Sequence, residues 1–460
     1  MPYHTRPYQF YDLARTLCST CLRRLDGKVV FEDGCAYLDK RCPEHGPERV
    51  LLADDVDWYR RSREVFLAPG GQPNQPGADA RHGCPFDCGL CAEHEQHTCV
   101  GLIEVTDRCE LRCPVCFAGS GPEHEGYRSL AQLESMMDAL ARSEDTLNVL
   151  QLSGGEPTLH PAFFAILDAA RRRPFRHLMV NTNGVRIAAD RAFAERLATY
   201  LPNFELYLQF DSLRPEALRA LRGADLSGVH SRALDTLDEL GISTTLVVTL
   251  ARGVNDCDLG EVLRFGLSRP CVRGVTIQPV QAAGRHDGYE PATGRITISE
   301  VRRKIAEQSG VFLLDDIIPV PCHSESMAMA YAFKLPGGVV PLSTLLQPQN
   351  NFAGLDPERA RKVFDAFSAG HSPSSHAASL RELLNCVPDA SAFQHLGYEA
   401  VFRVMIVQFM DATSMDLRSL HRSCIHIVHP DGRIIPFDTY NVFYRPGREA
   451  ALAAAIERSG

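Results

Sequence analysis

Apolar, β-branched segments alternate with amphipathic helical patterns through the middle of the chain. Six apolar segments have the length of buried strands, at residues 101–105, 148–152, 177–181, 204–210, 243–250 and 274–280. Helical patterns separate them, among them residues 130–142, 162–172 and 190–199. This α/β alternation predicts a parallel sheet that curves into a partial (β/α)6 TIM-like barrel.

The pattern of apolar and polar residues is different before and after these repeats. Near the N-terminus, residues 28–31 and 36–38 flank a turn and predict a β-hairpin. Residues 68–81 are rich in Pro, Gly and Gln, which is typical of a linker. Beyond residue 320 the sequence predicts a buried strand at 401–409, a hairpin around 430–432 and a loop at 372–375. We expect a smaller C-terminal α+β domain that closes the open side of the barrel.

Cysteines are the most unusual part of the composition. The chain has 16 of them, and 11 gather in three spaced groups before residue 117. In a reducing compartment, clustered cysteines are more often metal ligands than disulfides.

The third group directly follows the first predicted barrel strand and has the spacing C-x3-C-x2-C. Cys109, Cys113 and Cys116 can bind three irons of a four-iron cluster, which leaves the fourth iron open because no fourth cysteine is adjacent. Phe117 is expected to cover this cluster. The spacing resembles that of radical S-adenosylmethionine (SAM) enzymes. The alternative is a structural zinc site with a distant fourth ligand.

Polar motifs follow the later strands, where barrel enzymes place their chemistry. Gly154 and Gly155 allow close approach of the backbone to a ligand, and we expect Glu156 to bind the SAM ammonium group. Asn181, Asp211 and Gln278 are further candidates for cofactor or substrate contacts. Ordinary turn chemistry also favours such residues at strand ends.

The second cysteine group repeats the same spacing but has a fourth member. Cys84, Cys88, Cys91 and Cys99 can saturate an auxiliary [4Fe-4S] cluster, which would carry electrons or hold structure. The alternative is that this group is the SAM site and the Cys109 group is auxiliary.

The first group surrounds the N-terminal hairpin. Cys18, Cys21 and Cys42, with His45 or Cys35 as fourth ligand, have the layout of a tetrahedral site. We prefer His45, since it completes a second short knuckle with Cys42. Zinc or a rubredoxin-like iron both fit this ligand set.

Four regions follow from these assignments: a metal-binding hairpin domain at 1–67, an auxiliary-cluster segment at 68–100, the radical SAM partial barrel at 101–320 and the C-terminal domain at 321–460. In the last region Cys322, Cys424, His426 and His429 are either buried core residues or a further metal site.

From Cys18 to Asn441 the chain resembles the radical SAM group that contains the dihydropterin methylase and the archaeal tetraether lipid synthase. This resemblance implies SAM cleavage, an auxiliary cluster and carbon methylation or C–C bond formation on a pterin-like small molecule or a lipid. It also implies a low-potential electron donor such as flavodoxin or ferredoxin, and a reduced folate as one-carbon donor for a methylase. The chain departs from the group at Ser423 and Asp438, where cysteines are common.

The overall charge of the chain bears on which partners it can bind. A net charge of -9 and a pI of about 6.0 argue against binding of nucleic acid. No apolar stretch is long enough for a transmembrane segment and no signal peptide is apparent, so a cytoplasmic protein is expected. Two alternative functions are a peptide-modifying radical SAM enzyme, which should carry a leader-binding winged helix, and an iron–sulfur protein for electron transfer or redox sensing.

Overall fold

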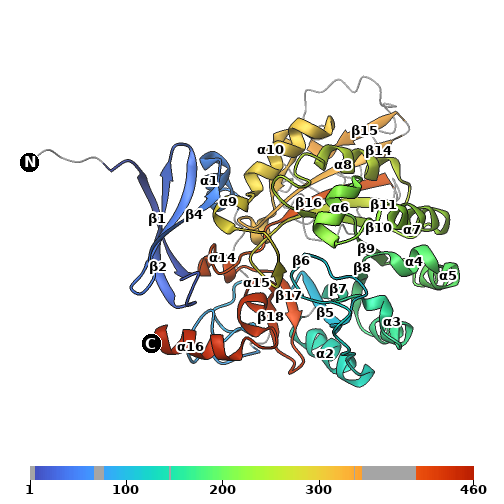
Figure 1. Cartoon of the computed structure of the whole chain (residues 1–460), viewed down its shortest axis with the longest axis horizontal. Coiled ribbons are helices and arrows are strands. Elements are labelled where there is room, and N and C mark those ends of the chain that lie inside the picture. Colours follow the sequence, from blue (N-terminus) through green and yellow to red (C-terminus); the bar gives the residue numbers. More distant parts are fainter. Residues whose placement is uncertain (1–5, 67–76, 145–146, 336, 344–399, 460) are drawn as a thin grey trace, which may run out of the picture.

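The computed structural model describes residues 6–66, 77–144, 147–335, 337–343 and 400–459 (Figure 1). The predicted loop at 372–375 and most of the predicted linker at 68–81 lie outside these residues.

The six predicted barrel strands all form, and each pairs in parallel with the next. They are β5 (Val100–Thr106), β7 (Leu147–Gly154), β8 (Phe175–Thr182), β9 (Phe204–Gln209), β10 (Thr244–Leu250) and β11 (Val272–Pro279). The α/β barrel architecture predicted from the sequence is therefore confirmed.

Helices between these strands cover the outer face of the sheet, and two more follow its sixth strand (Figure 1). They are α2 (Leu130–Ser143), α3 (Phe163–Arg171), α4 (Val185–Ala189), α5 (Arg191–Ala198), α6 (Pro215–Arg222), α7 (Ser227–Leu240), α8 (Leu259–Ser268), α9 (Pro291–Gly294) and α10 (Ile298–Ser309). Short 3-10 turns are η1 (Pro157–Leu159), η2 (Leu314–Asp316) and η3 (Pro321–His323).

The C-terminal part extends the same sheet at both ends. Its elements are β13 (Ile318–Pro319), β14 (Met327–Leu335), β15 (Gly338–Pro341), β16 (Val401–Val407), α14 (Leu417–Leu420), β17 (Ile425–Val428), β18 (Ile434–Pro436), α15 (Phe437–Thr439), the π-turn η6 (Tyr440–Tyr444) and α16 (Glu449–Ser459). The 12-stranded sheet runs β13-β14-β16-β11-β10-β9-β8-β7-β5-β17-β18, with β15 beside β14.

The predicted C-terminal α+β part therefore adds its strands to the barrel sheet itself. Strand β16 pairs in parallel with β11, and β17 pairs in parallel with β5. Every residue of β16 is buried, as expected for a strand with neighbours on both sides and both faces covered.

Alternate residues of the strands face two different interiors, as the period of two requires. Leu150, Val180 and Leu206 pack in the large core that includes the helices. Val149, Met179 and Tyr207 belong to a second small cluster, with Val247. The second set lines the inside of the barrel.

The N-terminal residues form a separate antiparallel sheet in the order β1-β2-β3-β4, followed by α1 (Val56–Glu64). Its strands are β1 (Gln9–Leu17), β2 (Arg24–Glu32), β3 (Cys35–Cys42) and β4 (Gly46–Ala53), and the predicted hairpin is its β2–β3 pair. The sheet contacts α10, α14 and α16 beside the barrel (Figure 1). Among the described residues, no helix has the length and apolar character needed to cross a membrane.

Candidate active site and metal centres

The loop that follows β5 carries Cys109, Cys113 and Cys116. Its end forms the short strand β6 (Val115–Cys116), which pairs with β12 (Arg285–His286). Arg285 donates from Nε to the Cys113 carbonyl at 2.5 Å and from Nη2 to the Ser120 carbonyl at 2.6 Å. Arg285 therefore fixes the backbone of this cysteine loop.

A cavity of about 1000 Å³ opens where the barrel strands end at this loop. It brings together most of the predicted site, namely Cys109, Cys113, Cys116, Phe117, Gly154, Gly155, Glu156, Asn181 and Gln278. Residues from four successive regions of the chain thus converge on one space, as expected for the carboxyl-end face of a barrel.

Cys109, Cys113 and Cys116 do not form one of the compact ligand groups of the described residues. Across the described part of the chain, metal-ligand atoms within 4.8 Å of one another form two groups, and neither contains Cys109, Cys113 or Cys116. One ion would need its ligands that close, whereas a four-iron cluster binds each thiolate through a different iron. Burial raises the pKa of both the Cys109 and the Cys113 thiols, so their thiolate forms depend on a bound metal.

The two glycines after β7 are needed for close packing of the backbone. A Cβ on Gly154 would lie 2.2 Å from the Thr106 carbonyl oxygen, and one on Gly155 would lie 2.1 Å from the Arg108 carbonyl oxygen. The Gly155 and Glu156 amides donate to these same carbonyls at 2.7 and 2.8 Å. The close approach inferred from the sequence is therefore made to the cysteine loop.

Glu156 is a buried carboxylate that borders the cavity with 1% exposure. It accepts hydrogen bonds from the amide and hydroxyl of Thr158, from Thr182 Oγ1 at 2.9 Å and from the Asn183 amide at 2.8 Å. Burial nevertheless raises its pKa to about 7, with a further contribution from Glu110. A cation in the cavity would stabilise its ionised form.

Asp211 does not line the cavity, in contrast to the prediction. It is fully buried, pairs with Arg222 through Oδ1 at 2.7 Å and accepts from the Thr249 amide at 2.8 Å. Arg222 itself lines the cavity and also donates to Gln209 at 2.9 Å. Sequence reasoning missed Arg222 because it lies at the C-terminus of α6, away from any strand end.

Asn183 belongs to the polar motif after the third barrel strand, from which only Asn181 was selected as a site residue. It is 7% exposed and borders the cavity, and among the described residues its Nδ2 has no hydrogen-bond partner. Its Oδ1 accepts from the Val185 amide at 3.0 Å. The signal was present in the sequence, since Asn183 follows the third barrel strand, but a turn at Asn-Gly explained it equally well.

A second cavity of about 670 Å³ adjoins the first inside the barrel. The two share Phe117, Asn181, Gln209, Gln278 and Phe409. The remaining walls are mostly apolar, with Gln151, Tyr207 and Arg403 as polar groups, and include Met179, Met327, Met405 and Phe437.

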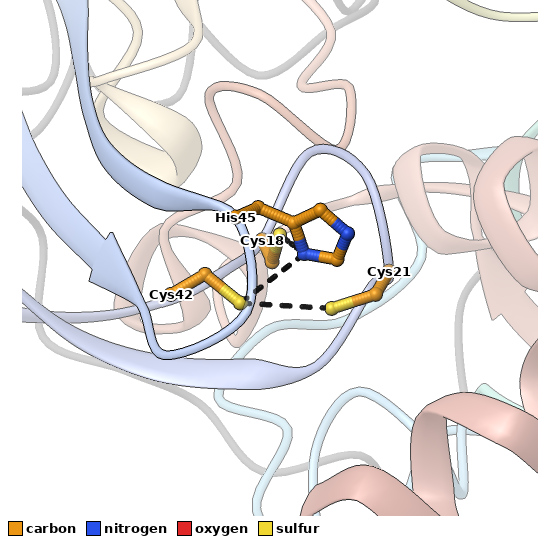
Figure 2. Close-up of side chains that lie close together, drawn as sticks. All are labelled: Cys18, Cys21, Cys42 and His45. Atoms are coloured by element: carbon orange, nitrogen blue, oxygen red, sulfur yellow. Dashed lines mark hydrogen bonds between the residues drawn. The ribbon is translucent and has the colours of Figure 1, made fainter.

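The N-terminal sheet holds the first of the two close ligand groups, formed by Cys18, Cys21, Cys42 and His45 (Figure 2). The Cys21 and Cys42 sulfurs are 3.8 Å apart, and His45 Nδ1 lies 3.6 Å from the Cys18 sulfur and 3.4 Å from the Cys42 sulfur. This set fits one tetrahedral ion. Cys35, the alternative fourth ligand, does not belong to it.

The second close group contains Cys99, Cys322 and Cys424, all buried. The Cys322 and Cys424 sulfurs are 3.7 Å apart. Cys99 was predicted to complete the cluster of Cys84, Cys88 and Cys91, and the structure places it against Cys322 and Cys424. The physical reason is that β17, which immediately follows Cys424, pairs with β5, which immediately follows Cys99.

The other members of the predicted auxiliary group stay together near η6. Cys84 and Cys88 share a side-chain hydrogen bond, and the Cys88 amide donates to the Tyr444 hydroxyl at 3.0 Å. His426 and His429 do not join Cys322 and Cys424. His426 instead lies 3.2 Å from His94, between ring nitrogens.

Comparison with known proteins agrees with this geometry. Residues 103–266 match the Radical SAM superfamily model, and residues 10–54 match the HMPTM N-terminal zinc ribbon domain. The chain is 28% identical to the 7,8-dihydro-6-hydroxymethylpterin dimethyltransferase of Methanocaldococcus jannaschii, over 96% of each protein. It is 26% identical to the GTP 3',8-cyclase of Geobacter sulfurreducens, over 61% of this chain and 82% of that protein.

Among solved structures, Streptococcus suis SuiB bound to precursor peptide SuiA matches 48% of this chain and 48% of its own length. The sequence identity is 15% and the TM-score is 0.40, a likeness that carries no argument about function.

Proposed function

We propose that the radical SAM domain of this chain binds SAM in the first cavity and cleaves it reductively. The observation that supports this most is the convergence of Cys109, Cys113, Cys116 and Glu156 on one cavity. A four-iron cluster with one open iron, when bound there, supplies the electron that converts SAM to methionine and a 5'-deoxyadenosyl radical.

The chain's own residues bind and orient the cofactor. Glu156 accepts the SAM ammonium group, since it is the buried acid of the cavity wall. Arg222 and the free Nδ2 of Asn183 donate to the SAM carboxylate or ribose, and Asn181 and Gln278 contribute further polar contacts. Phe117 covers the cluster and, because it borders both cavities, separates it from the substrate.

The second cavity is the proposed substrate site. Its walls are mostly apolar with a few polar groups, among them Gln151, Tyr207 and Arg403, as is common for small-molecule sites. The similarity to a pterin dimethyltransferase supports carbon methylation of a pterin-like molecule. The one-carbon unit would come from a reduced folate and the electron from a flavodoxin or ferredoxin. C–C bond formation is the alternative reaction.

Three further metal sites are part of the proposal. The Cys18 group holds zinc, in keeping with the zinc ribbon match, or a rubredoxin-like iron. Cys84, Cys88 and Cys91 hold an auxiliary cluster near η6. Cys99, Cys322 and Cys424 hold a third centre, with thiol spacing closer to that of a single ion.

The test is anaerobic reconstitution with iron and sulfide, followed by dithionite and SAM. We expect 5'-deoxyadenosine, and its complete absence in reconstituted protein would refute SAM cleavage. Cys113→Ala should abolish the product, whereas Cys99→Ala should leave cleavage at least partly intact. Equal loss of SAM cleavage in both variants would contradict the proposal that the Cys109 group cleaves SAM while Cys99 belongs to a different metal site. Addition of 7,8-dihydro-6-hydroxymethylpterin then tests the substrate, by the mass of a methylated product.

A further inference from the structure

Lys40 links the N-terminal sheet to a loop of the C-terminal part. Its side chain is almost fully buried, and Nζ donates to the Leu17 carbonyl at 2.7 Å and to the Thr413 carbonyl at 2.7 Å. Leu17 directly precedes the metal ligand Cys18. The lysine therefore contacts the metal knuckle on one side and a segment almost four hundred residues away on the other.

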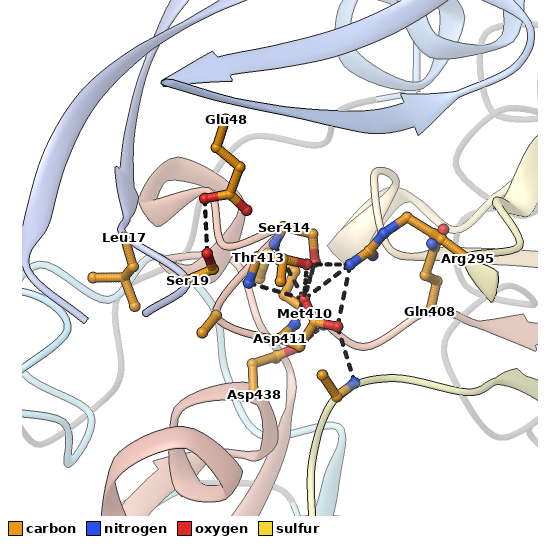
Figure 3. Close-up of polar contacts among 12 residues, drawn as sticks. Leu17, Ser19, Glu48, Arg295, Gln408, Met410, Asp411, Thr413, Ser414 and Asp438 are labelled. Carbon is orange, nitrogen blue, oxygen red and sulfur yellow. Dashed lines mark hydrogen bonds and ion pairs between the residues drawn. The ribbon is translucent and has the colours of Figure 1, made fainter. Parts of the chain in front are cut away.

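A second contact fixes the lysine to the same knuckle. Glu48 lies 3.4 Å from Lys40 Nζ. It also accepts a hydrogen bond from Ser19 Oγ at 2.9 Å, and Figure 3 shows this second contact. Ser19 lies between the metal ligands Cys18 and Cys21. The placement of Lys40 is thus tied to the conformation of residues 17–19, beside the candidate metal ligands.

Asp411 continues this chain of contacts toward the active site. Oδ1 accepts from the amides of Thr413 and Ser414, both at 3.1 Å, and so shapes the turn that Lys40 contacts (Figure 3). Arg295 pairs with the same carboxylate at 2.9 Å. Oδ2 accepts from the Ala282 amide at 3.0 Å.

Ala282 begins the segment that lies against the cysteine loop. Its neighbours Gln281 and Ala283 line the first cavity. Gly284 follows with φ of +60°, and a Cβ there would lie 2.2 Å from the Phe117 carbonyl oxygen. Arg285 then bonds the Cys113 carbonyl, so hydrogen bonds and close packing lead without a gap from Lys40 to the cysteine loop.

We propose that Lys40 and Asp411 are positioning residues, which transmit the placement of the N-terminal metal site through Ala282 to the loop that carries Cys113 and Cys116. The N-terminal sheet then serves the barrel's chemistry without contacting substrate. When its metal is lost, the knuckle around Ser19 relaxes, Lys40 loses its carbonyl partners, and the cysteine loop becomes more mobile. The effect on SAM binding rests on the proposed function, whereas the effect on loop mobility does not.

The chain offers a matched control at Lys334. This partly buried lysine also donates to backbone carbonyls, those of Arg269 at 2.8 Å and Val272 at 2.7 Å, but none of its partners lines either cavity. Lys40→Met and Lys334→Met each remove an ammonium group that donates hydrogen bonds to backbone carbonyls. Both are expected to destabilise the fold, and only the first is expected to affect the cysteine loop.

The experiment compares amide hydrogen exchange of the anaerobic holoprotein in wild type, Lys40→Met, Asp411→Asn and Lys334→Met. We expect residues 113–120 and 280–286 to exchange about tenfold faster in the first two variants and unchanged in the third. Cys21→Ser, which removes the N-terminal metal, should accelerate the same two segments even if Lys40→Met fails to fold.

Two outcomes would overturn the proposal: unchanged exchange of both segments in Asp411→Asn and Cys21→Ser, or equal acceleration in Lys334→Met. The SAM dissociation constant is the second readout, with an increase of about tenfold expected for Lys40→Met and none for Lys334→Met. If the wild type binds no SAM, the proposed function is refuted. If Lys40→Met and Asp411→Asn still exchange faster than that wild type, the positioning role stands.

Discussion

Glu156→Gln tests the electrostatic basis of the proposed SAM site. The carboxylate is buried and borders the first cavity, and burial raises its pKa to about 7. An ammonium group next to it forms a charge-assisted hydrogen bond, which is worth roughly 1.5–3 kcal/mol. Glutamine keeps the size of the side chain and the acceptor toward Thr158 but loses the charge. The SAM dissociation constant should therefore rise about tenfold to a hundredfold.

The sign of the pH dependence follows from the same pKa. The carboxylate is ionised above its pKa, so wild-type affinity for SAM is highest above pH 7 and falls as the pH drops through about 7. The fall approaches a factor of about ten per pH unit well below the pKa. In Glu156→Gln this dependence disappears, because no titrating carboxylate remains at the site.

The assay is equilibrium binding of SAM to the reconstituted, oxidised protein between about pH 6 and pH 8, where no cleavage occurs without an electron donor. Glu195→Gln serves as a control, since it makes the same change in a surface ion pair with Arg191 that lies outside both cavities. The reasoning is refuted if Glu156→Gln binds SAM as tightly as the wild type. A flat wild-type profile would show that the ammonium group binds elsewhere.

Three further predictions concern the architecture of the site. Gly155→Ala places a methyl group against the Arg108 carbonyl and should lower the iron content bound after reconstitution. The control is Gly228→Ala in α7, whose added Cβ would meet only the end of the Arg232 side chain, at 3.4 Å. Arg222→Met leaves Asp211 as an unpaired buried charge and should cost about 3–5 kcal/mol of stability, seen as a lower melting temperature. Further substitution of Asp211 by Asn should recover part of this loss, and no recovery would contradict the pairing. Cys42→Ser should remove one equivalent of metal while the other sites keep theirs, measured by elemental analysis.

The parallel core was predictable because its signals are local. Each strand is an apolar run and each helix has a hydrophobic stripe. The local pattern of apolar residues was therefore enough to identify each element. The N-terminal ligands were predictable for a related reason. His45 and Cys42 lie on one turn, and the two knuckles are joined by a hairpin that the sequence also indicates.

The features that were missed depend on contacts between distant segments. Cys99 meets Cys424 only because β17 pairs with β5, and a strand of four residues near the C-terminus carries no sign of its partner. Asp211 and Arg222 looked unrelated because one ends a strand and the other ends a helix. Lys40 resembled an ordinary surface lysine, since a buried cation that bonds carbonyls has no sequence signature.

The pairing of β5 between β7 and β17 has a consequence for biogenesis. During translation, the strand that leads into the cysteine loop has a neighbour on one flank as soon as residues 147–154 emerge from the ribosome. Its other edge has no paired strand until residues 425–428 are synthesised. A nascent chain would therefore reach its final shape around the loop only near the end of synthesis, and delivery of iron and sulfide by assembly factors should come after release. Truncation before residue 425 would leave this strand exposed along one side, as a template for association with other chains.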